Sequence, residues 1–143
     1  MTLKELITAI GQMAIQEKLV NYSASAGSIA QLNPLSIDYY PILFITPSGE
    51  HTVFENTTRF TISLTYIDRL LEDNSNDIDI YSTSVEELKN IIKGIKLIPG
   101  VIDVDSEYVI RNFTDTESMN DRVSGSYVQL RILVSNEIIC YEE

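Results

Sequence analysis

The segment of this chain that most resembles a metal-binding loop is Asp73-Asn74-Ser75-Asn76-Asp77. Its oxygen-bearing side chains occupy the first, third and fifth positions, which is the spacing of a calcium-binding loop. The pattern then fails, because Ile78 stands where that loop requires glycine and Ser84 stands where it requires a bidentate glutamate. We therefore expect a solvated turn here and no metal ligands.

Three further carboxylates, Asp103, Asp105 and Glu107, alternate along the chain before Tyr108. On a strand their side chains would share one face. Three like charges in that arrangement are more typical of an exposed strand or loop than of a divalent-cation site. The sequence therefore predicts no metal site at this place either.

The chain has one histidine and one cysteine. His51 lies in a predicted turn without an evident partner for proton transfer or metal binding. Cys140 stands among Ile138, Ile139 and Tyr141, as a buried small apolar residue would. The sequence contains no nucleophile elbow, phosphate loop, dinucleotide-binding fingerprint or paired-histidine helix. We predict no catalytic residues and no cofactor, and hence a protein that is not an enzyme.

Composition indicates a single globular domain over residues 1–143. Hydrophobic residues make up 44% of the chain and charged residues 22%, and no apolar run is long enough to cross a bilayer. The formal net charge of −11 disfavours sequence-independent phosphate binding, because there is no basic surplus to release counterions. The first residues do not have the pattern of a secretory signal. We expect a protein of the cytoplasm, or of a particle assembled there, with no membrane contact.

Helical periodicity appears in two places. The first is residues 2–19, where Thr2 and Glu5 form a predicted capping box. The second follows Ser84, which with Glu87 forms another predicted capping box, and it ends at Pro99-Gly100. The apolar stripe of the second helix consists of Val85, Leu88, Ile91, Ile92 and Ile95.

Two-residue alternation predicts the strands. Residues 58–70 bury one face, and a short strand is expected at 78–81. Residues 39–46 and 51–54 are expected to form a hairpin or near-hairpin around a turn at 47–50. Residues 107–116 and 126–135 are expected to form a long C-terminal hairpin with a loop at 117–125. The expected fold is α+β: a mainly antiparallel sheet, an N-terminal helix and a second helix packed on one face. A second long loop is expected at 21–36, where small polar residues precede Asn33-Pro34.

The run from Phe60 to Ile95 resembles the middle of small tail-completion proteins of tailed bacteriophages, especially the neck or tail ring proteins of crAss-like phages of Bacteroides. In those proteins an alternating strand ends in a Tyr-x-Asp-Arg-Leu-like element, and a polar turn with Asn, a strand and a Ser/Thr-capped helix follow. The matching positions here are Tyr66, Asp68, Arg69, Leu70, Asn76, Ile80, Ser82 and Leu88. The order of elements over the whole chain also resembles the tail terminator fold.

This resemblance implies a structural virion protein that forms a homo-oligomeric ring in the neck or tail, most simply six- or twelve-fold. Its partners would be further copies of itself and the portal, neck and tail proteins. DNA would pass through the central channel without specific binding. The two loops are the expected subunit contacts, with these interface residues: Ser25, Gly27, Ile29, Leu32, Glu117, Met119, Asp121 and Arg122. Carboxylates expected to face the channel are Asp121, Glu142 and Glu143.

Two other classes of function remain open at this point. The same loops would serve a non-enzymatic cytoplasmic binding or adaptor module equally well. An enzyme or metal-dependent regulator built on the Asp-rich segments is the third hypothesis, and it predicts that chelators change the melting temperature.

Overall fold

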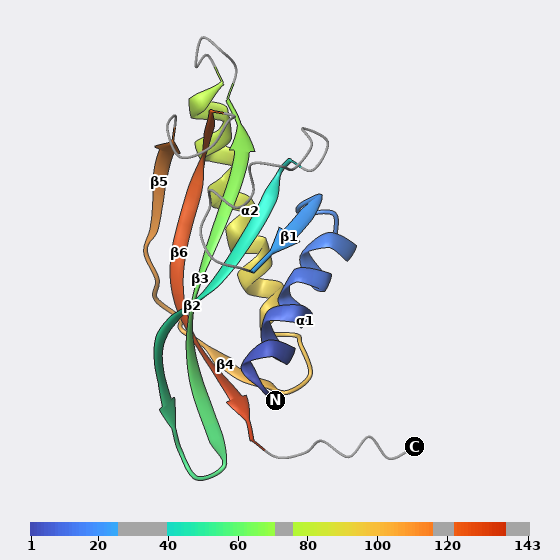
Figure 1. The fold of residues 1–143 in the computed structure, drawn as a ribbon, viewed down its shortest axis with the longest axis vertical. Helices are drawn as coiled ribbons and strands as arrows, with labels where there is room; N and C mark the ends of the chain where they lie inside the picture. Colours follow the sequence, from blue (N-terminus) through green and yellow to red (C-terminus); the bar gives the residue numbers. More distant parts are fainter. Residues whose placement is uncertain (26–39, 71–75, 116–121, 137–143) are drawn as a thin grey trace.

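The computed structural model describes residues 1–25, 40–70, 76–115 and 122–136. In chain order its elements are α1 (Leu3–Gln16), β1 (Tyr22–Ala24), β2 (Ile42–Val53), β3 (Thr57–Arg69), α2 (Asp77–Ile95), β4 (Val101–Val104), β5 (Ile110–Asp115) and β6 (Val123–Ser135). The expected α+β class, with an N-terminal helix, a second helix and a mainly antiparallel sheet, is confirmed (Figure 1).

One six-stranded sheet organises the molecule, in the order β1-β2-β3-β6-β4, with β5 also paired to β6. β1 is parallel to β2, and the other pairs are antiparallel. β3 pairs with β6 along its whole length, from Thr57 opposite Ser135 to Arg69 opposite Val123. The other side of β6 is shared, because β5 takes its first half and β4 its last residues.

Both helices pack on one face of this sheet (Figure 1). α1 begins as predicted, since the Thr2 hydroxyl accepts the Glu5 N–H at 3.1 Å and the Glu5 carboxylate accepts the Thr2 N–H at 2.8 Å. The predicted alternation of the long strands is also confirmed. The strand residues buried beneath the helices include Leu43, Ile45, Ile62, Leu64, Tyr66, Val128, Leu130, Ile132 and Val134.

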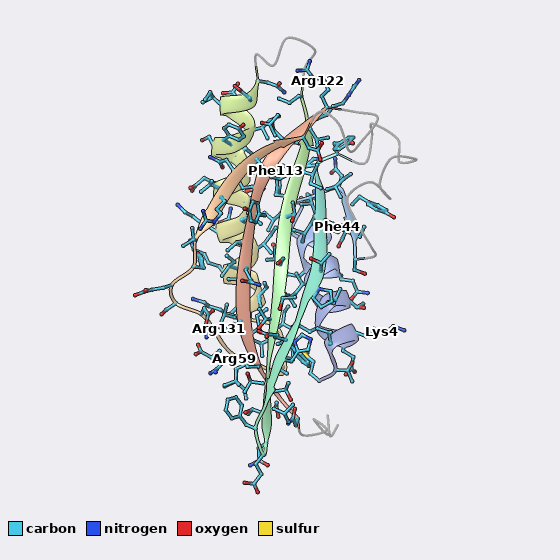
Figure 2. The ribbon with its side chains drawn as sticks, turned by 60° about the vertical axis from the view of Figure 1, so that its left-hand side comes forward. Lys4, Phe44, Arg59, Phe113, Arg122 and Arg131 are labelled. Carbon is cyan, nitrogen blue, oxygen red and sulfur yellow. The ribbon has the colours of Figure 1, made fainter. Side chains whose placement is uncertain are left out.

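A smaller apolar cluster lies on the opposite face, at the end of the sheet where β5 pairs with β6. Its members are Tyr40, Ile42, Phe44, Ile67 and Val123, with Tyr22, Ala24 and Phe113 packed against them. Phe44 and Phe113 are labelled in Figure 2. The upper half of the sheet is therefore apolar on both faces, whereas the lower half carries polar residues such as Thr61 and Gln129 away from the helices.

The expected short strand at 78–81 is wrong, because α2 already begins at Asp77. Asp77 and Asp79 lie in its first turn, where carboxylates interact favourably with the helix dipole. Ser84 is not a helix cap but a fully buried residue inside the helix, and the cap position is Asn76. The helix ends at Ile95, before the predicted stop at Pro99-Gly100.

The predicted turn at 47–50 is also wrong, because β2 continues through it to Val53. The register with β3 shifts between Pro47 and His51, so these residues form a bulge, and Gly49 has a φ of 94°. The hairpin turn lies later, where the Phe54 N–H donates to the Thr57 carbonyl at 2.8 Å.

Several loop and strand limits differ from the expectation. The 21–36 segment contains β1, which pairs with Ile42–Phe44 of β2, and the 117–125 segment ends in the first residues of β6. The expected strand at 107–116 is shorter, since β5 begins at Ile110. β5 does pair with β6, but their connection at 116–121 lies outside the described residues, so the long C-terminal hairpin stays a prediction.

Candidate interaction surface

The part of the chain that the structure describes contains no group of three or more His, Cys, Asp or Glu residues that could hold a metal ion. Asp105 instead accepts from the Arg131 side chain, with Nε at 3.1 Å from the carboxylate oxygen. His51 lies on exposed β2, where its ring meets Phe60 edge-on and its Nδ1 accepts the Thr61 N–H at 3.3 Å. These contacts link neighbouring strands of the sheet.

No helix among the described residues is long and apolar enough to span a membrane.

The first open edge belongs to β2. β1 pairs with it only at Ile42–Phe44, and no other described strand lies along its outer side as far as Val53. Pro47 lacks an N–H, and the adjacent bulge interrupts the ladder. Both features limit indiscriminate strand addition at an edge.

β2 and β3 extend together as an arm beyond the helices (Figure 1). Val53 is 75% exposed near its end, and Phe54 is 43% exposed. The Arg59 guanidinium lies over the Phe54 ring at 5.4 Å, near the lower end of the sheet in Figure 2. Asn136, after β6, holds the arm by donating its N–H to the Asn56 carbonyl at 2.9 Å. The arm is an exposed but well-anchored extension.

The second open edge is formed by β5. β5 pairs with β6 in unbroken register from Ile110 to Asp115, and no described strand lies along its other side. It contains no proline and no bulge. Unlike the β2 edge, it is a regular template for an added strand.

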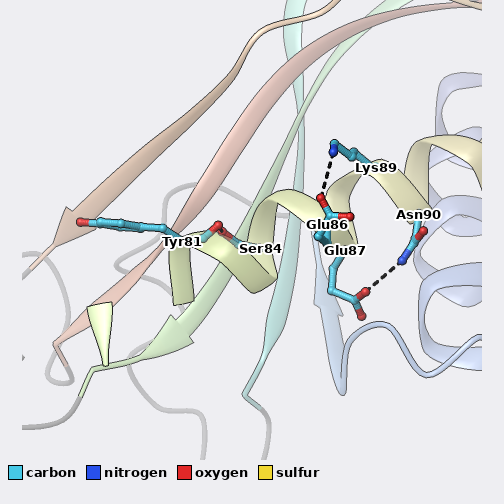
Figure 3. A network of polar contacts seen from close by, with 6 residues as sticks. All are labelled: Tyr81, Ser84, Glu86, Glu87, Lys89 and Asn90. Atoms are coloured by element: carbon cyan, nitrogen blue, oxygen red, sulfur yellow. Dashed lines mark hydrogen bonds and ion pairs between the residues drawn. The ribbon is translucent and has the colours of Figure 1, made fainter. Parts of the chain in front are cut away.

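An open hollow of about 760 Å³ adjoins the beginning of this edge. Val109 is 64% exposed there, and Tyr108 and Ile110 are half-buried. The complete lining consists of Lys89, Ser106, Glu107, Tyr108, Val109 and Ile110. The Lys89 amine bonds the Glu86 carboxylate at 2.9 Å (Figure 3), and this hydrogen bond raises the pKa of Lys89 and lowers the pKa of Glu86.

Hydroxyl groups tie β5 and β6 to α2. The Tyr81 side chain points from α2 toward β5 (Figure 3), where its hydroxyl lies 2.5 Å from that of Thr114, and Thr114 bonds Ser124 at 2.8 Å. Deeper in the same layer, the Ser84 and Ser126 hydroxyls are 2.6 Å apart. These bonds hold the edge strand in a fixed position against the helix.

Two ionisable residues on β3 lie close to this layer. Burial raises the pKa of Tyr66, and the nearby charges of Asp68 and Glu87 raise it further. Burial also raises the pKa of the Asp68 carboxyl, opposed by the hydrogen bond that it accepts from the Arg69 N–H at 2.8 Å. Among the described residues, neither group belongs to a cluster of three or more His, Cys, Asp or Glu residues that could hold a metal ion.

Only two of the predicted interface residues are described. Ser25 is exposed after β1, beside a small hollow of about 230 Å³ against α1, and Arg122 precedes β6, where its carbonyl accepts the Leu70 N–H at 2.8 Å. Outside the described residues lie Gly27, Ile29, Leu32, Glu117, Met119, Asp121, Glu142 and Glu143, and also Cys140 and Asp73–Ser75.

The β5 edge and its hollow were missed by sequence reasoning. The available signal was the apolar run Tyr108-Val109-Ile110, which a strand with one wet face would not contain. Conversely, half of the eight positions that carry the resemblance are buried residues of the fold, namely Tyr66, Leu70, Ile80 and Leu88.

No protein-family model matches this chain, and no curated protein is found that is similar to it.

Proposed function

We propose that this chain is the subunit of a homo-oligomeric ring in the neck or tail of a tailed bacteriophage, joining head or portal to tail around the DNA channel. The observation that carries the proposal is a single sheet in which β2, beyond Phe44, and β5 have no described strand along their outer sides. The resemblance of residues 60–95 to tail-completion proteins supports the same role and is the reason for assigning it to a phage particle.

Two different edges favour a head-to-tail contact over a two-fold one. A surface that is not its own complement joins copies heterologously, and such contacts close into a ring when the rotation between copies allows it. The rigid core under the helices and the projecting β2–β3 arm give each copy a fixed body and an extension toward its neighbours.

The distribution of charge is compatible with a wall that DNA slides past. The described residues contain thirteen carboxylates and ten basic side chains, whereas residues 26–39, 71–75, 116–121 and 137–143 contain eight carboxylates and no Lys or Arg. Repeated around a ring, this excess of negative charge would repel a polyanion.

The test measures the mass of the purified full chain by mass photometry and native mass spectrometry over a range of concentrations, and looks for the chain in purified virions. We expect a closed oligomer, with six or twelve copies as the simplest numbers, and its presence in particles. A strict monomer that is absent from virions would overturn the proposal.

A non-enzymatic adaptor is the second candidate, favoured by a separate surface. An open hollow of about 490 Å³ lies between the C-terminal parts of α1 and α2, with Met13, Leu19 and Ile98 among its lining residues. Leu97 beside them is 83% exposed. Affinity capture that returns one host protein and no portal or tail protein, and that is abolished by Leu97→Asp, would favour the adaptor over the ring.

A further inference from the structure

We infer that residues 137–143 of one copy bind a second copy as an added strand along the outer edge of β5, with apolar side chains entering the hollow at Val109. The inference rests on the proposed ring and names the contact that joins its subunits.

The first feature that supports this inference is the outer backbone edge of β5. Its six residues are regularly paired on the β6 side. The N–H and C=O groups that point outward face no other described strand, and such groups form hydrogen bonds with an added strand. The bonds to Tyr81 and Ser124 fix the Thr114 side chain, so the edge is already in place before a partner arrives.

The second feature is the hollow beside this edge. In strand addition the backbone provides affinity, and pockets for alternate side chains provide specificity. Val109 and the half-buried Tyr108 and Ile110 make an apolar site next to the edge. Arg111, exposed on β5 and paired with Tyr127, adds a positive charge on the other face of the same edge.

The segment 137–143 has matching chemistry. Its sequence is Glu-Ile-Ile-Cys-Tyr-Glu-Glu, so four apolar residues, Ile138 to Tyr141, stand between carboxylates. β-branched and aromatic residues favour strands. On a strand, Ile139 and Tyr141 would share one face and could fill the hollow, while Glu142 would lie on the other face, which is the face of Arg111.

Register shows that a strand added along β5 must come from a second copy. β5 ends its pairing with β6 at Ile110 opposite Val128, and Asn136 lies eight residues farther along, about 27 Å at the rise of an antiparallel strand. Tyr141 can extend no more than about 17 Å from Asn136 at the same rise. A chain therefore cannot lay its own apolar segment on its own β5.

The experiment uses disulfide cross-linking, because Cys140 is the chain's one cysteine. Val109→Cys and Arg111→Cys are made separately in the full chain, oxidised mildly with copper phenanthroline, and resolved on non-reducing gels. Thr52→Cys on the β2 edge is the matched control, and each variant is repeated with Cys140→Ser. Circular dichroism checks that every variant is folded.

We expect covalent multimers from Val109→Cys and Arg111→Cys that disappear with Cys140→Ser, and few from Thr52→Cys. Truncation after Asn136 should reduce the oligomer to monomer. A ring that forms without these cross-links, or that survives the truncation, overturns this inference and leaves the proposed function intact. A chain that is monomeric at every concentration overturns both. A cross-link confined to one chain overturns the donor assignment and with it the inference.

Discussion

At the scale of single residues, the most unusual group is Asp68, a carboxyl half-buried on β3 beneath α2. Burial raises its pKa above the value in the unfolded chain. Stability attributable to this group is therefore full below the unfolded pKa and is lost as the pH rises through the folded pKa.

We predict that Asp68→Asn makes the protein more stable at pH 7, because the amide removes the penalty on the charged form. Asparagine can still accept the Arg69 N–H. The advantage should shrink as the pH falls through the folded pKa and should disappear below the unfolded pKa of about 3.9, where wild-type Asp68 is also neutral. Thermal unfolding of both proteins between pH 3 and 8 measures this difference in stability. A gain that is constant over that range would show that the charge of Asp68 is not its cause.

Gly125 is a second residue whose type is dictated by its surroundings. A Cβ at this position would lie 1.7 Å from the Tyr66 carbonyl oxygen, a backbone atom of the paired strand. Gly125→Ala must therefore push β3 and β6 apart, at a cost of about 3 kcal/mol. Gly49→Ala is the control, since Gly49 has open space but a positive φ, and should cost about 1 kcal/mol. Urea unfolding compares the two, and equal losses would contradict the steric explanation.

At the scale of elements, α1 owes its start to local chemistry. The reciprocal bonds of Thr2 and Glu5 satisfy N–H groups that the helix leaves unpaired. Thr2→Ala should cost about 1 kcal/mol, whereas Thr8→Ala, on the exposed face of the same helix, should be neutral or slightly stabilising.

The cost of losing the cap should also depend on pH. The bond from the Thr2 N–H lowers the pKa of Glu5, so its contribution is present above the unfolded pKa and is lost as the pH falls through the folded pKa. Because Thr2→Ala keeps this backbone N–H, chemical denaturation of Glu5→Gln at pH 7 and pH 3 measures the difference. An equal cost at both pH values would remove Glu5 from the explanation.

α2 is anchored to the sheet by the buried Ser84–Ser126 contact. Ser84→Ala removes a partner from a buried hydroxyl and should cost about 1 to 2 kcal/mol. Ser126 also bonds the Asn112 side chain at 2.6 Å, so its replacement should cost at least as much. The double variant should be less destabilised than the sum of the single ones, and strict additivity would show that the two hydroxyls are not coupled.

At the scale of the whole molecule, two exposed apolar sites lie on different sides of the fold, Val109 beside β5 and Leu97 after α2. If the ring uses the β5 edge, Val109→Asp should shift assembly to monomer while Leu97→Asp leaves the oligomer unchanged. Both side chains are largely exposed, so the unfolding free energy of each variant should stay within about 0.5 kcal/mol of wild type. Native mass spectrometry measures the oligomeric state of both variants. Loss of the oligomer with Leu97→Asp but not with Val109→Asp would indicate that the interface lies at the helices instead.

Sequence periodicity was sufficient for the helix at α1, for the buried faces of β3 and β6 and for the α+β class, because each depends on neighbours a few residues apart. It was insufficient at residues 77–83. Ile78 and Ile80 fit a strand by alternation, yet Ile80, buried Ser84 and Leu88 also fit a helical stripe, and the partner that accommodates buried Ser84 is Ser126, forty-two residues away.

The Asp-rich segments and the predicted loops also show the difference between what residue types determine and what tertiary pairing determines. Residue types alone argued against a metal at 73–84, where the ligand pattern was incomplete, and at 103–107, where three like charges are typical of an exposed strand or loop. Which stretches become edges was decided by tertiary pairing: β3 extends far enough to carry β2 through the proline and glycine at 47–49, and β6 is long enough to hold both β4 and β5 on one side. A strand edge is open when no distant segment pairs with it, and the local sequence does not determine whether such a segment exists.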